Sequence, residues 1–209
     1  MTTMEPGAAP NLIERVKNIL LTPQAEWDRI KPEQTSFQQL IVGYALPLIA
    51  LSALCTFIGQ AFVGVPLVGR YPIQWALTGL VTSVVLGVAM VWLLGFIINA
   101  IAPTFGSQQN QMQANKVAVY SATAGWLGGV FTIIPMLGIL ALVASIYSLV
   151  LLWFGLPKLM ETPEDKKIGY FATVLVIAIL LVLVVTMVVG AVLATMGFSA
   201  AAMMGARPY

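Results

Sequence analysis

Residues 168–196 read IGYFATVLVIAILLVLVVTMVVGAVLATM, a stretch without a charged side chain. About 20 consecutive apolar residues are enough for a helix to cross the roughly 30 Å hydrocarbon core of a bilayer. A helix that is apolar on every side also needs apolar surroundings on every side. The stretch therefore predicts a transmembrane helix, and similar stretches recur along the chain.

The composition extends this prediction to the whole protein. Its 209 residues are 59% apolar and only 9% charged, whereas soluble domains carry about 25% charged residues. Between Gln34 and Pro157 the charged side chains are those of Arg70 and Lys116. Because so few charges cannot cover a water-facing surface, the outer face must meet the lipid bilayer.

Prolines, glycines and polar connections divide the apolar sequence into five stretches. The sequence thus predicts an all-α polytopic membrane protein, with a five-helix transmembrane domain over residues 37–197. We expect a segment with two short helices over residues 1–36 and a short tail over residues 198–209. The predicted spans are 37–63, 72–102, 116–134, 137–156 and 168–196.

The distribution of lysine and arginine predicts the orientation. Eight of these residues fall on one side of the predicted membrane, and two, Arg70 and Arg207, fall on the other. Basic residues are enriched in cytoplasmic connections, so we expect a cytoplasmic N-terminus and an external C-terminus. The eight residues are Arg15, Lys17, Arg29, Lys31, Lys116, Lys158, Lys166 and Lys167.

The N-terminal segment has the pattern of a short amphipathic helix followed by a second short helix. Thr22 is predicted to cap the second helix, Pro23 to begin it and Pro32 to follow its end. The helices either lie on the bilayer or cap the bundle, or they form a docking platform for a cytoplasmic protein partner. The predicted apolar face holds Leu12, Ile13, Val16, Ile19 and Leu20, and the predicted polar face holds Glu14, Arg15, Lys17 and Asn18.

The residues needed for several kinds of chemistry are absent from the sequence. The chain has no histidine and one cysteine, Cys55, and its predicted spans contain no Asp or Glu. Glu161, Glu164 and Asp165 adjoin lysines, which is typical of a solvated turn. We therefore expect no catalytic, cofactor-binding or metal-binding residues and no enzymatic activity. The weak, scattered positive charge also argues against a nucleic-acid partner.

Small residues repeat at four-residue spacing, which favours close helix packing within the bundle or at a homo-oligomer interface. An alternative function remains open, that of a small-solute transporter or channel, possibly a homo-oligomer. Its polar path would be lined by Gln60, Asn99 and the prolines in or beside the spans. The small residues are Gly79, Ser83 and Gly87, then Gly125 and Gly129, then Gly190 and Ala194. The prolines are Pro47, Pro72, Pro135 and Pro157.

The order of several short motifs resembles the Yip (Ypt-interacting protein) family, in its bacterial branch, over about residues 11–185. The motifs are Leu20-Leu21-Thr22-Pro23, Glu26-Trp27, Gly43-Tyr44 with Pro47, Val119-Tyr120-Ser121, Ile134-Pro135, Tyr147 and Gly155-Leu156-Pro157-Lys158-Leu159-Met160. The resemblance implies a five-span helical protein of the bacterial inner membrane.

Eukaryotic Yip relatives are associated with Rab-type GTPases and vesicle traffic through acidic, tyrosine-containing N-terminal motifs. The roughly 36 residues before the first predicted span have no counterpart of those motifs. We therefore expect a scaffold or organiser of membrane components rather than a trafficking factor. Its contacts would run through the N-terminal helices and the connection between the fourth and fifth spans.

Overall fold

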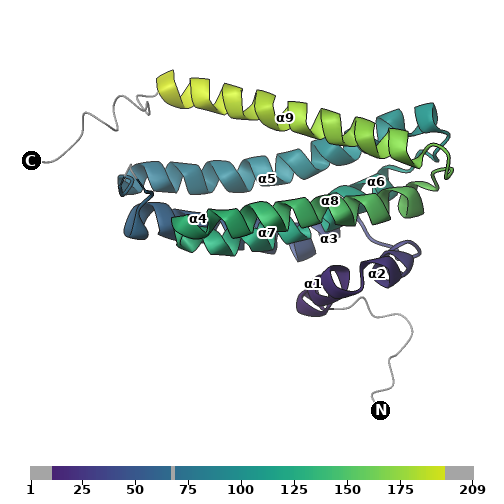
Figure 1. The fold of residues 1–209 in the computed structure, drawn as a ribbon, viewed down its shortest axis with the longest axis horizontal. Coiled ribbons are helices and arrows are strands. Elements are labelled where there is room, and N and C mark those ends of the chain that lie inside the picture. Colours follow the sequence, from purple (N-terminus) through teal and green to yellow (C-terminus); the bar gives the residue numbers. More distant parts are fainter. Residues whose placement is uncertain (1–10, 67–68, 196–209) are drawn as a thin grey trace, which may run out of the picture.

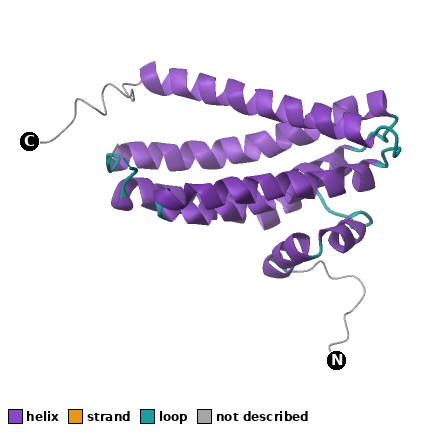
Figure 2. Ribbon diagram, in the orientation of Figure 1, coloured by secondary structure: helices purple, strands orange, loops and turns teal. Residues whose placement is uncertain are grey.

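The computed structural model describes residues 11–66 and 69–195. Within these residues the secondary structure is helical, apart from one isolated bridge between Val65 and Gly69, and the helices lie side by side in an elongated bundle (Figure 2). The predicted tail over residues 198–209 lies outside the described residues.

Four helices are long and apolar enough to cross a membrane, which indicates a multi-pass membrane protein. Three of them contain α5 (Ile73–Ile101), α8 (Gly138–Met160) and α9 (Lys167–Thr195), which run along the length of the bundle (Figure 1). Their positions coincide with four of the five predicted spans. The four helices cover Phe37–Val63, Ile73–Phe105, Pro135–Met160 and Lys167–Val192.

The first helix contains two widened turns. It begins at a capping box between Ser36 and Gln39. A proline removes one backbone N–H and crowds the carbonyl one turn earlier, and the π-helical turn before Pro47 makes room for it. The consecutive elements are α3 (Phe37–Leu40), a π-helical turn (Ile41–Ala45), α4 (Leu46–Ile58) and a second π-helical turn (Gly59–Val63).

The predicted span 116–134 is not one helix in the structure. The chain instead forms α6 (Gln111–Ser121), α7 (Thr123–Gly128) and a 3₁₀ turn (Gly129–Ile133). The hydroxyls of Ser121 and Thr123 donate to the carbonyls of Val117 and Tyr120, and such bonds compete with the helical pattern. The eight residues from Ala114 to Ser121 are all buried, because α6 packs between α5 and α8.

The helix that contains the predicted fourth span, 137–156, extends beyond it. α8 continues through Pro157 to Met160 and ends at Glu161, whose φ of 51° is left-handed. Proline removes one helical hydrogen bond, but Leu156, Leu159 and Met160 are buried. Burial of this last turn accounts for the continued helix, since each large apolar side chain contributes about 1.5–3 kcal/mol.

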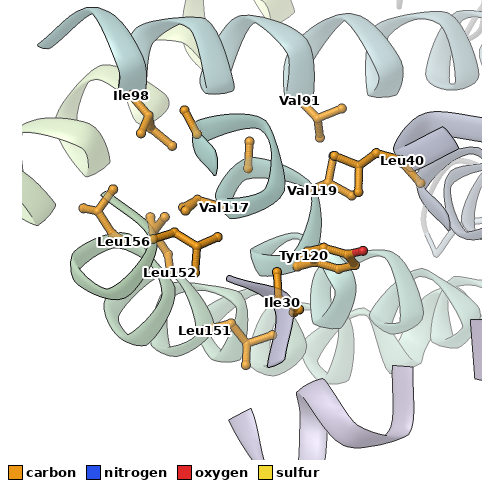
Figure 3. Close-up of a cluster of buried hydrophobic side chains, with 14 of the residues drawn as sticks. Ile30, Leu40, Val91, Ile98, Val117, Val119, Tyr120, Leu151, Leu152 and Leu156 are labelled. Atoms are coloured by element: carbon orange, nitrogen blue, oxygen red, sulfur yellow. The ribbon is translucent and has the colours of Figure 1, made fainter. Parts of the chain in front are cut away.

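The hydrophobic core lies toward the end of the bundle where α1 (Leu12–Leu21) and α2 (Pro23–Ile30) are attached. Figure 3 shows Ile30 of α2 beside Tyr120 and Leu151, so the N-terminal segment contributes directly to this core. By contrast, many large side chains of α9 beyond Val174 are more than half exposed, among them Val176, Leu183 and Met187. These side chains form the kind of surface that lipid covers.

Two of the predicted small residues account for close helix crossings. A Cβ atom on Gly129 would lie 1.9 Å from Ser52 Oγ, and one on Gly87 would lie 2.8 Å from Ile49 Cγ2. A Cβ on Gly190 would meet nothing within 4 Å. Gly87 and Gly129 therefore serve packing inside the bundle, as one of the two interpretations predicted.

Gly59 gives the sharpest test of this packing, because an added Cβ would lie 2.0 Å from the carbonyl oxygen of Thr132. We expect Gly59→Ala to lower the free energy of unfolding by about 1–3 kcal/mol through overpacking. The matched control is Gly43→Ala in the same helix, where an added Cβ meets nothing within 4 Å. Thermal denaturation of both variants in detergent measures the difference, and equal midpoints would contradict the packing of the first helix on residues 129–133.

Candidate functional site

The N-terminal segment begins with two helices separated by a single residue, and both lie against one side of the bundle (Figure 1). The side chain of Asn11 caps α1 by accepting from the N–H of Glu14. Thr22 precedes α2 as predicted, but its hydroxyl donates back to the carbonyl of Asn18 and makes no cap bond to α2. Proline at the first position of α2 needs no partner for its missing N–H.

The face of α1 that meets the bundle differs from the predicted one. Arg15, assigned to the polar face, is 3% exposed, whereas Ile13, assigned to the apolar face, is 79% exposed. Ile19 is fully buried, as its apolar position predicts. The helix is rotated toward Arg15 because the guanidinium finds buried carboxylate partners, which amphipathic spacing does not reveal.

Arg15 joins the two helices and the linker that follows them. Its guanidinium lies 2.7 Å from the carboxylate of Glu26, which is fully buried, and also pairs with Glu33. Arg29 approaches Glu26 from the exposed side at 3.4 Å. Burial by itself lowers the pKa of Arg15, but the carboxylates, Glu33 foremost, offset this and raise the pKa above its ordinary value. Arg15 is therefore a permanent cation held inside the protein.

Lys116 of α6 holds the end of α2. Its side chain is 1% exposed, and its ammonium donates to the carbonyl oxygens of Ile30, at 2.9 Å, and Glu33, at 2.7 Å. The last carbonyls of a helix lack intrahelical partners and carry partial negative charge, so they suit a cation. The sequence predicts Lys116 at the cytoplasmic start of the third span, and the structure places its side chain in the interior.

Aromatic packing extends this contact into the bundle. Trp27 is fully buried and lies so close to Gly155 that a Cβ there would come within 2.4 Å of the indole ring. The rings of Trp27 and Tyr120 meet edge to face at 6.2 Å, and Arg15 lies 5.6 Å from the Tyr120 centroid. Tyr44 stacks edge-on against Tyr120 at 4.7 Å. We call Arg15, Glu26, Trp27, Glu33, Lys116 and Tyr120 the N-terminal docking cluster.

Hydrogen bonds from α8 fasten the segment around this cluster. The hydroxyl of Tyr147 donates to the carbonyl of Leu20 at 2.7 Å. The ammonium of Lys158 donates to the carbonyl of Gln24 at 2.8 Å and to Asp28 at 2.7 Å. The N-terminal segment is thus bonded to both α6 and α8, which makes it a structural part of the bundle.

An ion pair beside the cluster ties the segment to the connection between α8 and α9. Lys31 pairs with Glu161 at 2.7 Å, and this contact lowers the pKa of the Glu161 carboxyl. Gln113 of α6 donates to the carbonyl of Lys31 at 2.8 Å. Lys31 and Glu161 are both 41% exposed, so solvent screens this pair and the buried cluster remains the main attachment.

The interactions of the docking cluster attach the N-terminal segment to the bundle. Within residues 11–66 and 69–195 no group of three or more metal-binding side chains is placed to hold an ion. The charged groups of the cluster are engaged with one another or with backbone carbonyls. These interactions join α1, α2 and the linker to α6.

The buried ion pair leads to a prediction about stability. We expect Arg15→Met to lower the free energy of unfolding by about 3–5 kcal/mol, because it leaves the Glu26 carboxylate buried without its close partner. The double variant Arg15→Met/Glu26→Met should regain most of that loss, since it removes both charges. Chemical denaturation in detergent provides the measurement.

The matched control is Lys158→Met, which removes the partly exposed ion pair with Asp28. We expect this change to cost at most about 1 kcal/mol. A loss for Arg15→Met no larger than that of the control, or a double variant as unstable as the single one, would contradict the buried pairing.

Residues that carried the sequence resemblance meet at this site: Leu20, Trp27, Tyr44, Tyr120, Tyr147, Gly155 and Lys158 all make the contacts described above. The model of the Yip1 domain matches residues 17–187, which is most of the chain and includes the docking cluster apart from Arg15. A search of curated proteins finds no match, and a search of solved structures finds none either. The family match together with four apolar helices shows that this chain belongs to the Yip1 domain family of membrane proteins.

Proposed function

We propose that the protein is a non-enzymatic scaffold or organiser of membrane components in the bacterial inner membrane. This proposal rests on one observation about α2: one of its faces is buried against the bundle and the other is exposed. Its inner face is fixed in the docking cluster through Glu26, Trp27 and Ile30, which are fully buried. Its outer face is exposed and carries the polar residues Gln24, Asp28 and Arg29 together with Ala25. A rigid outer face can bind a partner without the cost of ordering a flexible segment.

The charges beside α2 fit a protein partner. Asp28 and Arg29 carry opposite charges, and exposed Glu164, Asp165 and Lys166 follow in the connection between α8 and α9. Anionic lipid and nucleic acid attract surfaces that are mainly basic. A mixed-charge surface instead favours a protein with complementary charges, for which such patterns set specificity.

A fifth membrane crossing and the predicted orientation form part of the same proposal. α6, α7 and the 3₁₀ turn follow one another over Gln111–Ile133, and they pack against α4, α5 and α8. About 23 residues in these conformations have the length of a crossing. An odd number of crossings places the C-terminus outside when α1 and α2 are cytoplasmic, in agreement with the lysine and arginine count.

The described residues do not favour the transporter alternative. Gln60 lies beside the start of α5, where its Oε1 is 3.9 Å from a Cβ built on Gly79. Asn99 follows Gly79 by twenty residues in the same helix, which corresponds to about 30 Å. The two amides are therefore too far apart to line one solute site.

The test compares the same substitution at two exposed glutamines, one on the outer face of α2 and one in the linker beyond it. We expect Gln24→Arg, on the outer face of α2, to reduce recovery of the partner protein at least about tenfold, because it places a large charged side chain in the contact. Gln34→Arg makes the same change in the linker beyond α2 and should leave recovery unchanged. The measurement is affinity recovery of the full chain from native membranes in mild detergent, followed by mass identification and sizing.

Point variants suit this test better than deletion of residues 1–33. The deletion would remove the carbonyls that hold the buried ammonium of Lys116, so lost recovery could reflect an unstable bundle. A stoichiometric partner that Gln24→Arg alone releases supports the proposal. A homo-oligomer without another protein, or equal recovery with both variants, would overturn it.

A further inference from the structure

A pocket of about 260 Å³ lies between five helices of the bundle, α5 to α9, and none of its lining residues belongs to the docking cluster. Its walls include Gly87 and Val91 of α5, Ser121 of α6, Leu149 of α8, and Leu175 and Ala178 of α9. The two serines in the wall are already engaged, since Ser121 donates to the carbonyl of Val117 and Ser148 accepts from the N–H of Gly125. The pocket therefore offers an apolar interior.

The pocket lies along helices that face lipid. α9 is fixed near its beginning, where Tyr170 and Val174 are fully buried and the Tyr170 hydroxyl donates to the carbonyl of Ile98 at 2.6 Å. Farther along, α9 separates from α5 in Figure 1, and Val182, which lines the pocket, is 51% exposed. Three of the pocket's walls, α5, α8 and α9, belong to helices long and apolar enough to cross a membrane.

A lysine and two aromatic side chains lie at one end of the contact line between α8 and α9, which we call the seam. One face of α9 carries Lys167, Phe171 and Leu175, because these residues are spaced four apart. The same spacing places Leu149 and Trp153 on one face of α8. The ammonium of Lys167 lies 5.1 Å from the centroid of the Trp153 ring. Trp153 also meets Phe171 edge to face at 5.1 Å. The seam thus runs from a cation, past two aromatic rings, to the pocket residues Leu149 and Leu175.

We propose that this seam binds one anionic glycerophospholipid, with its phosphate at Lys167, its glycerol region on Trp153 and one acyl chain in the pocket. Tryptophan and lysine are the side chains suited to the depth of lipid headgroups, and the positive charge complements the phosphate. Glu164, the carboxylate beside Lys167, is 3.9 Å away and 87% exposed, so it forms a weak, solvated contact that a phosphate can replace.

The pocket suits an acyl chain, because its walls are apolar and three of them belong to helices long and apolar enough to cross a membrane. A flexible chain of methylene groups can enter such a space, where van der Waals packing against the walls stabilises the complex. The lipid site is tested at Lys167 and the pocket, whereas the scaffold function is tested at α2, so the two proposals can fail separately.

The test uses native mass spectrometry of the purified full chain, loaded separately with phosphatidylglycerol and phosphatidylcholine in detergent. We expect Lys167→Gln to lower retention of phosphatidylglycerol about fivefold, the effect of one basic residue near a lipid surface. Ala178→Phe, which fills the pocket, should abolish retention of either lipid. The controls are Lys166→Gln in the same connection and Val184→Phe on an exposed position of α9, and both should retain lipid like the unaltered protein.

The size of the particle and its thermal midpoint, measured for each variant, separate a lost lipid from a misfolded bundle. Lower retention in both Lys167→Gln and Ala178→Phe, with folded particles and unaffected controls, supports the site. Retention unchanged in either variant, a loss equal to that in its control, or occupancy by detergent alone would overturn it.

Discussion

Lys116 and Arg15 are buried cations in a chain whose membrane domain contains few charges, and their partners come from the N-terminal segment. Lys116 binds the carbonyls of Ile30 and Glu33, and Arg15 binds the carboxylates of Glu26 and Glu33. A buried charge without partners costs several kcal/mol. The bundle and the segment are therefore coupled, because removing the segment would leave Lys116 unpaired and removing the bundle would expose Trp27.

This coupling divides the molecule into two regions with different surroundings. At the end that carries α1 and α2, charged and aromatic side chains are packed into a protein core, and large residues such as Trp27, Tyr170 and Met160 are fully buried. Along α9 the surface is apolar and the lipid bilayer supplies the packing. The pocket and the seam between α8 and α9 lie where these regions meet, which is where a bound phospholipid would bridge protein and membrane.

The sequence predicts the helical class and the positions of four apolar helices, because length and hydrophobicity alone determine which segments can cross a bilayer. It does not predict the break at Ser121 and Thr123, where hydroxyls compete for backbone carbonyls. Arg15 and Glu26 are eleven residues apart, and Lys116 is remote from both, so local spacing cannot show that they meet. Two sequence signals point to the docking cluster: the resemblance motifs that contain Glu26, Trp27 and Tyr120, and Lys116, an isolated cation between long apolar stretches.

The central claim, that the N-terminal segment is an integral part of the bundle, is tested most directly by hydrogen exchange of the intact protein in lipid nanodiscs. Backbone amides open with a free energy that reflects how cooperatively their element is packed. The structure predicts that the amides of α2 exchange as slowly as those of α6, because the docking cluster joins the two helices. Rapid exchange throughout α2 beside slow exchange in α6 would contradict the account and would show a segment that moves independently of the bundle.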